Sequence, residues 1–334
     1  NFVKSSDWPL DIVQDKTAPD TRSLRIKVTH FKCGGISVSF GFHHQVVDGA
    51  GACKVLKVLS GILENEKIDA QPLIEDRTAI FNAIMKQADA SQYSTGAQVS
   101  IPMEKLADAF AANANVTPVP SKMQYVRLNF DQIQKQRAEF NRASGMNLSV
   151  NDIICGFVWY HYILQNENET SPWKFLFVVD MRRQLNEYIP GKYIGNCAVL
   201  CRALLNKPKE EITLKDTSLS IRLALQDFMN TKNIAEMFMW YEEQFAIPAM
   251  ILPSFRMKTP TGYPDVLISS WSRFPFYEIS LGIDKPLYAG SPPSPGTSGI
   301  GIFQPLRNTP DILLAMNMPH SVFNSMCSSP MVVT

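Results

Sequence analysis

Two adjacent histidines and an aspartate stand close together in the segment FGFHHQVVDGAG, residues 40–51. Imidazole, with an ordinary pKa of about 6.5, suits proton transfer at neutral pH better than any other side chain. Apolar residues alternate from Ile36 to Phe42, which would place His44 on the buried face of a strand, at its end. The segment therefore predicts a general base carried by a rigid strand.

Simpler explanations compete with catalysis. Asp48 before a helical pattern is a good N-cap, and Gly49 could serve only a turn. A single histidine at a strand end is more often a hydrogen-bonded core residue than a catalyst. A metal site is disfavoured, because the side chains of His43 and His44 diverge on a strand and no other cluster has ligand spacing.

The elements that must position these residues follow from periodicity. A hairpin is expected over 24–42, turning at Gly34-Gly35, and a closing hairpin over 299–319. Strands are expected at 123–130, at 174–182, where a continuous apolar run predicts burial on both faces, and in the region 265–282; residues 192–205 predict a strand pair or a bend. Helices are expected at 55–63, 131–143, 149–165, 214–230 and 234–246. This order fits no simple strand–helix–strand repeat, so we expect a mixed-sheet α+β or α/β fold.

Composition excludes several classes of protein. The 334 residues are 45% hydrophobic with a formal net charge of +1, enough for two domains and without the basic surface that nucleic acid requires. We find no apolar run of membrane-spanning length and no signal-peptide pattern. The six cysteines form no CxxC pair, which favours a reduced, cytoplasmic protein, and we expect a monomer.

Four segments then resemble one family in order and spacing. HHQVVDG resembles the HxxxD motif of acyl-CoA-dependent acyltransferases, the plant BAHD enzymes and the fungal trichothecene O-acetyltransferase group. Three further family segments are similar to LSVNDIICGFVW (148–159), VVDMRRQLNEYIPGKYIGN (178–196) and SSWSRFPFYEISLGIDKP (269–286). The resemblance implies a two-domain, chloramphenicol-acetyltransferase-like architecture with a channel between the domains. The domains would be 1–85 and 125–334, joined by a crossover at 86–124, with part of 280–305 packing back on the first.

The resemblance also implies roles. His44 would be the general base that activates a hydroxyl or amine of a small-molecule acceptor, a secondary metabolite, toward acyl-CoA. The resemblance implies no permanently bound cofactor and no metal. Ser269 and Trp271 are candidate oxyanion donors, although Trp271 fits a core aromatic equally well. Asp48 would pair with Arg182 and, with Gly49, shape the loop instead of relaying charge.

Three polar residues are assigned to CoA with structural alternatives beside them. Ser149 would meet the pantetheine or phosphate end of CoA, or only cap a helix, which we favour. Tyr193 and Asn196 belong to a Y-x-G-N turn that either contacts the ligand or packs near the channel.

The sequence departs from the family twice. SLGID (280–284) replaces the family's D-F-G-W-G, which puts the geometry of that loop in doubt. The family's catalytic histidine also lies deeper in the chain, so part of the first domain and one wall of the acceptor pocket would be missing, or supplied by a separate polypeptide. Two rival functions follow: a condensation-type domain that uses a carrier-protein thioester, and a truncated, non-catalytic relative.

Overall fold

A computed structural model describes residues 23–44, 46–67, 77–88, 96–108, 111, 119–167, 172–189, 191, 193–247, 249–253, 265–291 and 298–333. The first 22 residues of the expected first domain lie outside this description. So do several parts of the expected 86–124 crossover.

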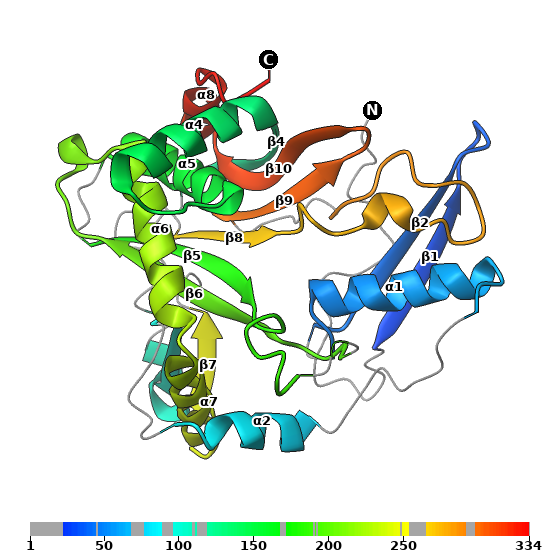
Figure 1. The fold of residues 1–334 in the computed structure, drawn as a ribbon, viewed down its shortest axis with the longest axis horizontal. Coiled ribbons are helices and arrows are strands. Elements are labelled where there is room, and N and C mark those ends of the chain that lie inside the picture. Colours follow the sequence, from blue (N-terminus) through cyan, green and yellow to red (C-terminus); the bar gives the residue numbers. More distant parts are fainter. Residues whose placement is uncertain are drawn as a thin grey trace.

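A six-stranded sheet in the order β4-β10-β9-β8-β5-β6 forms the centre of the larger part of the molecule (Figure 1). Its strands are β4 Ser121–Leu128, β5 Trp173–Asp180, β6 Ala198–Leu205, β8 Val266–Ser270, β9 Ile300–Leu306 and β10 Thr309–Pro319. The pairs β5–β8 and β8–β9 are parallel, and the other neighbours are antiparallel. The mixed-sheet prediction is therefore confirmed, and so is the closing hairpin, β9–β10.

Among the described residues, four helices pack against this sheet: α4, α5, α6 and α8. Their bounds are α4 Phe130–Ser144, α5 Val150–Gln165, α6 Leu214–Phe228 and α8 His320–Cys327. α5 is buried almost throughout, because its run of apolar residues meets the sheet, α6 and α8. It begins at a capping box formed by Ser149 and Asp152, which confirms the helix cap expected at Ser149. A Cβ on Gly156 would collide with Ser218, so glycine permits α5 and α6 to cross closely.

The hairpin β1 (Leu24–His30) and β2 (Ile36–Phe42) lies with helix α1 (Gly49–Leu63) on the other side of the molecule (Figure 1). Both hairpin and helix are confirmed. The predicted burial of the apolar face is wrong: side chains such as Ile26 and Val28 are 51% and 53% exposed. In the described part of the chain this sheet has two strands.

A third group of elements was partly missed from the sequence. β3 (Gln98–Pro102) pairs antiparallel with β7 (Ala249–Pro253), and α2 (Arg77–Met85) packs against α7 (Thr231–Phe245). β3 lies within the segment expected to be an irregular crossover. Three short 3₁₀ helices complete the described structure: Met103–Lys105, Lys209–Glu211 and Phe276–Glu278.

Candidate active site

His44 lies in a turn, not on a strand. β2 ends at Phe42, and the His43 N–H donates to the Ser23 carbonyl at 2.9 Å. The His43 carbonyl then accepts from Val46 N–H at 2.9 Å, which turns the chain toward α1. His44 is consequently exposed, and the prediction that it occupies the buried face of a strand is wrong. An exposed imidazole can exchange protons with a ligand or solvent.

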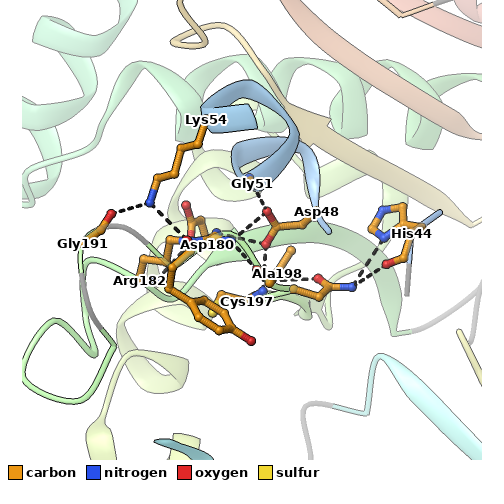
Figure 2. A network of polar contacts seen from close by, with 12 residues as sticks. His44, Asp48, Gly51, Lys54, Asp180, Arg182, Gly191, Cys197 and Ala198 are labelled. Atoms are coloured by element: carbon orange, nitrogen blue, oxygen red, sulfur yellow. Dashed lines mark hydrogen bonds and ion pairs between the residues drawn. The ribbon is translucent and has the colours of Figure 1, made fainter. Parts of the chain in front are cut away.

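Asp48 anchors the other end of this turn. Its carboxylate accepts from the N–H groups of Gly51 and Cys197, each at 2.8 Å, so it does cap α1. Both oxygens also accept from Arg182, at 2.9 and 3.0 Å, in a bidentate pair with exposures of 3% and 9% for the two side chains. These partners occupy the carboxylate, and Figure 2 shows it apart from the His44 ring.

Arg182 is held by more than Asp48. It also contacts Asp180 at 2.9 Å, the Tyr193 carbonyl at 3.2 Å and the Gly195 carbonyl. Burial acts to lower the pKa of Arg182, but the hydrogen bond and charge of Asp48, with the charge of Asp180, outweigh it and raise the pKa. The guanidinium therefore stays charged inside this cluster.

Lys54, on α1, is a member of the cluster that sequence reasoning missed. Its ammonium donates to the carbonyls of Gly191 at 2.6 Å and Tyr193 at 3.3 Å. Burial, followed by the neighbouring Arg182, lowers the pKa of Lys54, and Asp180 and Asp48 partly oppose the shift. The available signal was a lysine directly after the buried Cys53 in an otherwise apolar turn of helix.

Asn196 connects the cluster to His44. Its side-chain N–H donates to the His44 carbonyl at 2.8 Å and approaches the ring nitrogen Nδ1 at 3.5 Å. The second distance is too long for a strong hydrogen bond, so Asn196 acts mainly on the backbone of the turn. Figure 2 shows His44 beside the Asp48–Arg182 pair.

Ser269 and Trp271 lie at the end of β8. The Trp271 indole N–H donates to the Ser269 hydroxyl oxygen at 3.1 Å, so in this arrangement the indole proton is already used. A Cβ on Gly49 would stand 3.3 Å from the Trp271 ring nitrogen and 3.0 Å from Phe274. The absence of a side chain at Gly49 therefore makes room for these two aromatic rings.

Ser149 and Tyr193 have structural partners. The Ser149 hydroxyl donates to the Asp152 carboxylate at 2.9 Å and accepts from the Asp152 N–H at 3.2 Å. The helix-cap interpretation thus accounts for its hydrogen bonds. Tyr193 is 2% exposed, and its carbonyl is shared by Lys54 and Arg182.

Other chemistries find little support around α1. Burial, with a contribution from Asp48, raises the pKa of Cys53 to about 12, so this thiol is not a nucleophile at neutral pH. Within the described ranges, no three His, Cys, Asp or Glu side chains gather as a metal site would need. None of the helices described is long and apolar enough to span a membrane.

His44 and Asp48 thus form an HxxxD arrangement on a mixed-sheet fold, and comparison with known proteins identifies the family. The model of the Transferase family matches residues 9–325, and the chain belongs to this family. Hydroxycinnamoyltransferase 1 from Oryza sativa is 24% identical over 269 residues, 80% of this chain and 59% of the relative. A hydroxycinnamoyl-CoA:5-hydroxyanthranilate N-hydroxycinnamoyltransferase from Avena sativa, HHT4, is 23% identical over 80% of this chain and 58% of the relative.

Solved structures agree on the fold. TRI101 from F. graminearum, in complex with coenzyme A and T-2 mycotoxin, superposes with a TM-score of 0.72 at 15% identity. The match covers 95% of this chain and 70% of that one. The chain spans less than two thirds of the length of the two plant relatives.

Proposed function

We propose that this chain transfers an acyl group from acyl-CoA to a hydroxyl or amine of a small molecule, with His44 as general base. The observation that carries the proposal is an exposed imidazole on a turn that is fixed at both sides. Asn196 holds the His44 carbonyl, and the Asp48–Arg182 pair holds the residues that follow. Asp48 shapes the turn and takes no proton.

The acyl group passes directly from the thioester to the acceptor, and no covalent acyl-enzyme is formed. The acceptor O–H or N–H gives its proton to the His44 ring as its oxygen or nitrogen attacks the thioester carbonyl. The carbon–sulfur bond of the tetrahedral intermediate then breaks, and the imidazolium protonates the departing thiolate. A thiol with a pKa of about 8.5 is a good leaving group, so this second step needs little assistance.

Ser269 is the proposed donor to the oxyanion. Its oxygen accepts the Trp271 N–H, which leaves its own O–H hydrogen free to turn toward a ligand. Trp271 then acts by orienting and polarising Ser269. The proposal still places three residues near CoA: Ser149, Tyr193 and Asn196. Their proposed role is to position the backbone there, and their side chains do not contact the ligand.

The donor and acceptor classes are proposed from relatives. HHT4 is named for hydroxycinnamoyl-CoA and an aromatic amine, and TRI101 was solved with CoA and a mycotoxin. The first experiment is calorimetric titration of this chain with CoA and acetyl-CoA. Saturable micromolar binding is expected. A folded protein that binds neither overturns the proposal for this chain, and binding only to a phosphopantetheinylated carrier protein would support the condensation-type rival.

Transfer is tested separately from binding. Free thiol release from hydroxycinnamoyl-CoA is followed with 5-hydroxyanthranilate and with a panel of alcohols. His44→Ala is expected to lower kcat by about 100-fold to 10,000-fold while CoA affinity is unchanged. His43→Ala, which alters the neighbouring imidazole, is the matched control and is expected to keep most of the activity.

A further inference from the structure

Backbone groups of four alternate residues, 191, 193, 195 and 197, are fixed by side chains of the cluster. Lys54 binds the Gly191 carbonyl, and Lys54 and Arg182 share the Tyr193 carbonyl. Arg182 also binds the Gly195 carbonyl, and Asp48 accepts from the Cys197 N–H. Asn196, which reaches His44, is thus flanked on both sides by residues with fixed backbone groups.

Lys54 contributes something that the Asp48–Arg182 pair cannot. Arg182 holds the segment at 193 and 195, close to Asn196, and only Lys54 among these side chains reaches Gly191. Without Lys54 the Gly191 carbonyl would lose this contact, and of the two cations only Arg182 would remain on the Tyr193 carbonyl. The backbone on the N-terminal side of Asn196 would then be held less firmly, which weakens one of the two constraints on the position of Asn196 relative to the turn.

The charge of the cluster also favours a second cation. Asp48 and Asp180 supply two carboxylates, and Arg182 alone would leave one of them uncompensated. The charges of both carboxylates act to raise the pKa of Lys54. Lys54 also lies in the first two turns of α1, whose N-cap is Asp48. The ammonium therefore couples the helix that follows His44 to the segment that carries Asn196.

We propose that Lys54 is a positioning residue for His44: with Arg182 it clamps the carbonyls of residues 191, 193 and 195, and Asn196 passes that constraint to the turn. The inference rests on the proposed function where it concerns turnover, but the clamp itself can be tested without it. Lys54 touches neither reacting group and is not a catalytic residue.

The variants are Lys54→Met, which keeps the length of the side chain and removes the charge and the donors, and Lys54→Arg, which restores both. Lys57→Met is the matched control, because Lys57 is on the same helix, and its side chain is 69% exposed, with Glu278 4.0 Å away. We expect Lys54→Met to lower kcat about 10-fold to 100-fold, with less than a 2-fold change in KM for acyl-CoA. Lys54→Arg should recover most of the loss, and Lys57→Met should match the wild type.

A second readout does not depend on turnover. The ring signals of His44, assigned by comparison with His44→Gln, are expected to shift in Lys54→Met, and amide exchange in peptides covering 191–197 is expected to accelerate. Both should remain unchanged in Lys57→Met. Unchanged His44 signals and exchange in a folded Lys54→Met protein overturn the clamp, whether or not the wild type is active.

The kinetic result separates the two proposals. If the wild type is inactive and the His44 signals shift in Lys54→Met, the proposed function is overturned and the clamp is supported. An active wild type whose kcat is insensitive to Lys54→Met overturns the positioning role. A loss that appears only as a raised KM, or that Lys54→Arg fails to recover, also counts against it.

Discussion

Asp48 accepts hydrogen bonds from two peptide N–H groups and from both terminal nitrogens of Arg182, all within a buried pair. Removal of one partner of such a pair leaves an uncompensated charge in a region of low dielectric constant. The Asp180 carboxylate contacts the same guanidinium but is 47% exposed, so water can replace it. The two carboxylates on Arg182 should therefore differ greatly in what they contribute to stability.

We predict that Asp48→Ala lowers the free energy of unfolding by about 3–5 kcal/mol. Asp180→Ala, the matched control, should lower it by less than about 1 kcal/mol, as is usual for exposed pairs. Urea unfolding of the three proteins measures both values. Equal losses, or an Asp48→Ala protein of wild-type stability that lacks turnover, would contradict the structural role given to Asp48.

For individual residues, the sequence predicted those contacts that depend on particular residue types in a recognisable motif. The Asp48–Arg182 pair was expected from family motifs, although 134 positions separate its members and no periodicity links them. Lys54 was missed because its partners are backbone carbonyls, which any residue supplies. The hydrogen bond between Trp271 and Ser269 was also invisible, because both side chains were assigned as separate donors.

Among the elements, α1 is attached at its C-terminal end as well as at Asp48. Ser60 accepts from the Ser280 N–H at 3.1 Å, and the Ser280 hydroxyl donates to Glu64. Both serines are buried, at 7% and 9% exposure. Ser280 begins the SLGID segment that replaces the family's D-F-G-W-G, so this chain joins that loop to α1 through hydroxyl groups.

We predict an order of stability effects at this contact. Ser60→Ala leaves the buried Ser280 N–H without its acceptor and should cost about 1–3 kcal/mol. Ser280→Ala keeps that N–H bonded to Ser60 and should cost about 1 kcal/mol or less. Chemical unfolding of both variants and of the double variant tests this. A larger effect of Ser280→Ala than of Ser60→Ala would show that the hydroxyl–Glu64 contact dominates.

Elements were predictable where the signal is local. Gly34-Gly35, the N-cap of α1 and the Ser149–Asp152 box gave boundaries close to those observed. β3 and β7 were not predicted as a pair, because each has five residues and their pairing partners lie about 150 positions apart. The prediction that β2 continues to His44 was wrong. The alternation of apolar residues indicates which face of a strand each residue takes, but it does not indicate where strand pairing ends.

For the whole molecule, the β1–β2 sheet and the six-stranded sheet differ in burial. Leu24, Ile26 and Val28 on β1 are at least 40% exposed, whereas most of β5 is buried. Exposed amides in a sheet of few strands open at low free energy. We predict that β1 and β2 amides exchange well before those of β5 at pH 7, measured by hydrogen exchange with mass spectrometry. Equal protection would show that these faces are covered in solution.

The contact between α5 and α8 contains a histidine, His161, that takes no part in the proposed reaction. His161 is 7% exposed, and its Nδ1 lies 2.8 Å from the Ser325 hydroxyl on α8. The rings of Phe157 and Tyr160 stand 4.5 and 5.5 Å from the imidazole, centre to centre. Burial lowers the pKa of His161 to about 4, below its ordinary value of 6.5, because the charged ring would lose hydration.

Acid should therefore destabilise the fold through His161. Between pH 6.5 and 4 the unfolded chain binds a proton that the folded chain does not, so stability falls as pH falls through that window, by about 2 kcal/mol between pH 7 and 5. Asp265 acts in the opposite direction, because burial raises its pKa to about 6, so total stability is a poor measure. The informative quantity is the difference between the pH dependence of the wild type and of His161→Phe, which cannot titrate there. We expect His161→Phe to lose about 2 kcal/mol less than the wild type over this range, measured by urea unfolding at each pH. Parallel curves for the two proteins would mean that His161 charges without cost, and that the packing of α5 on α8 tolerates an imidazolium.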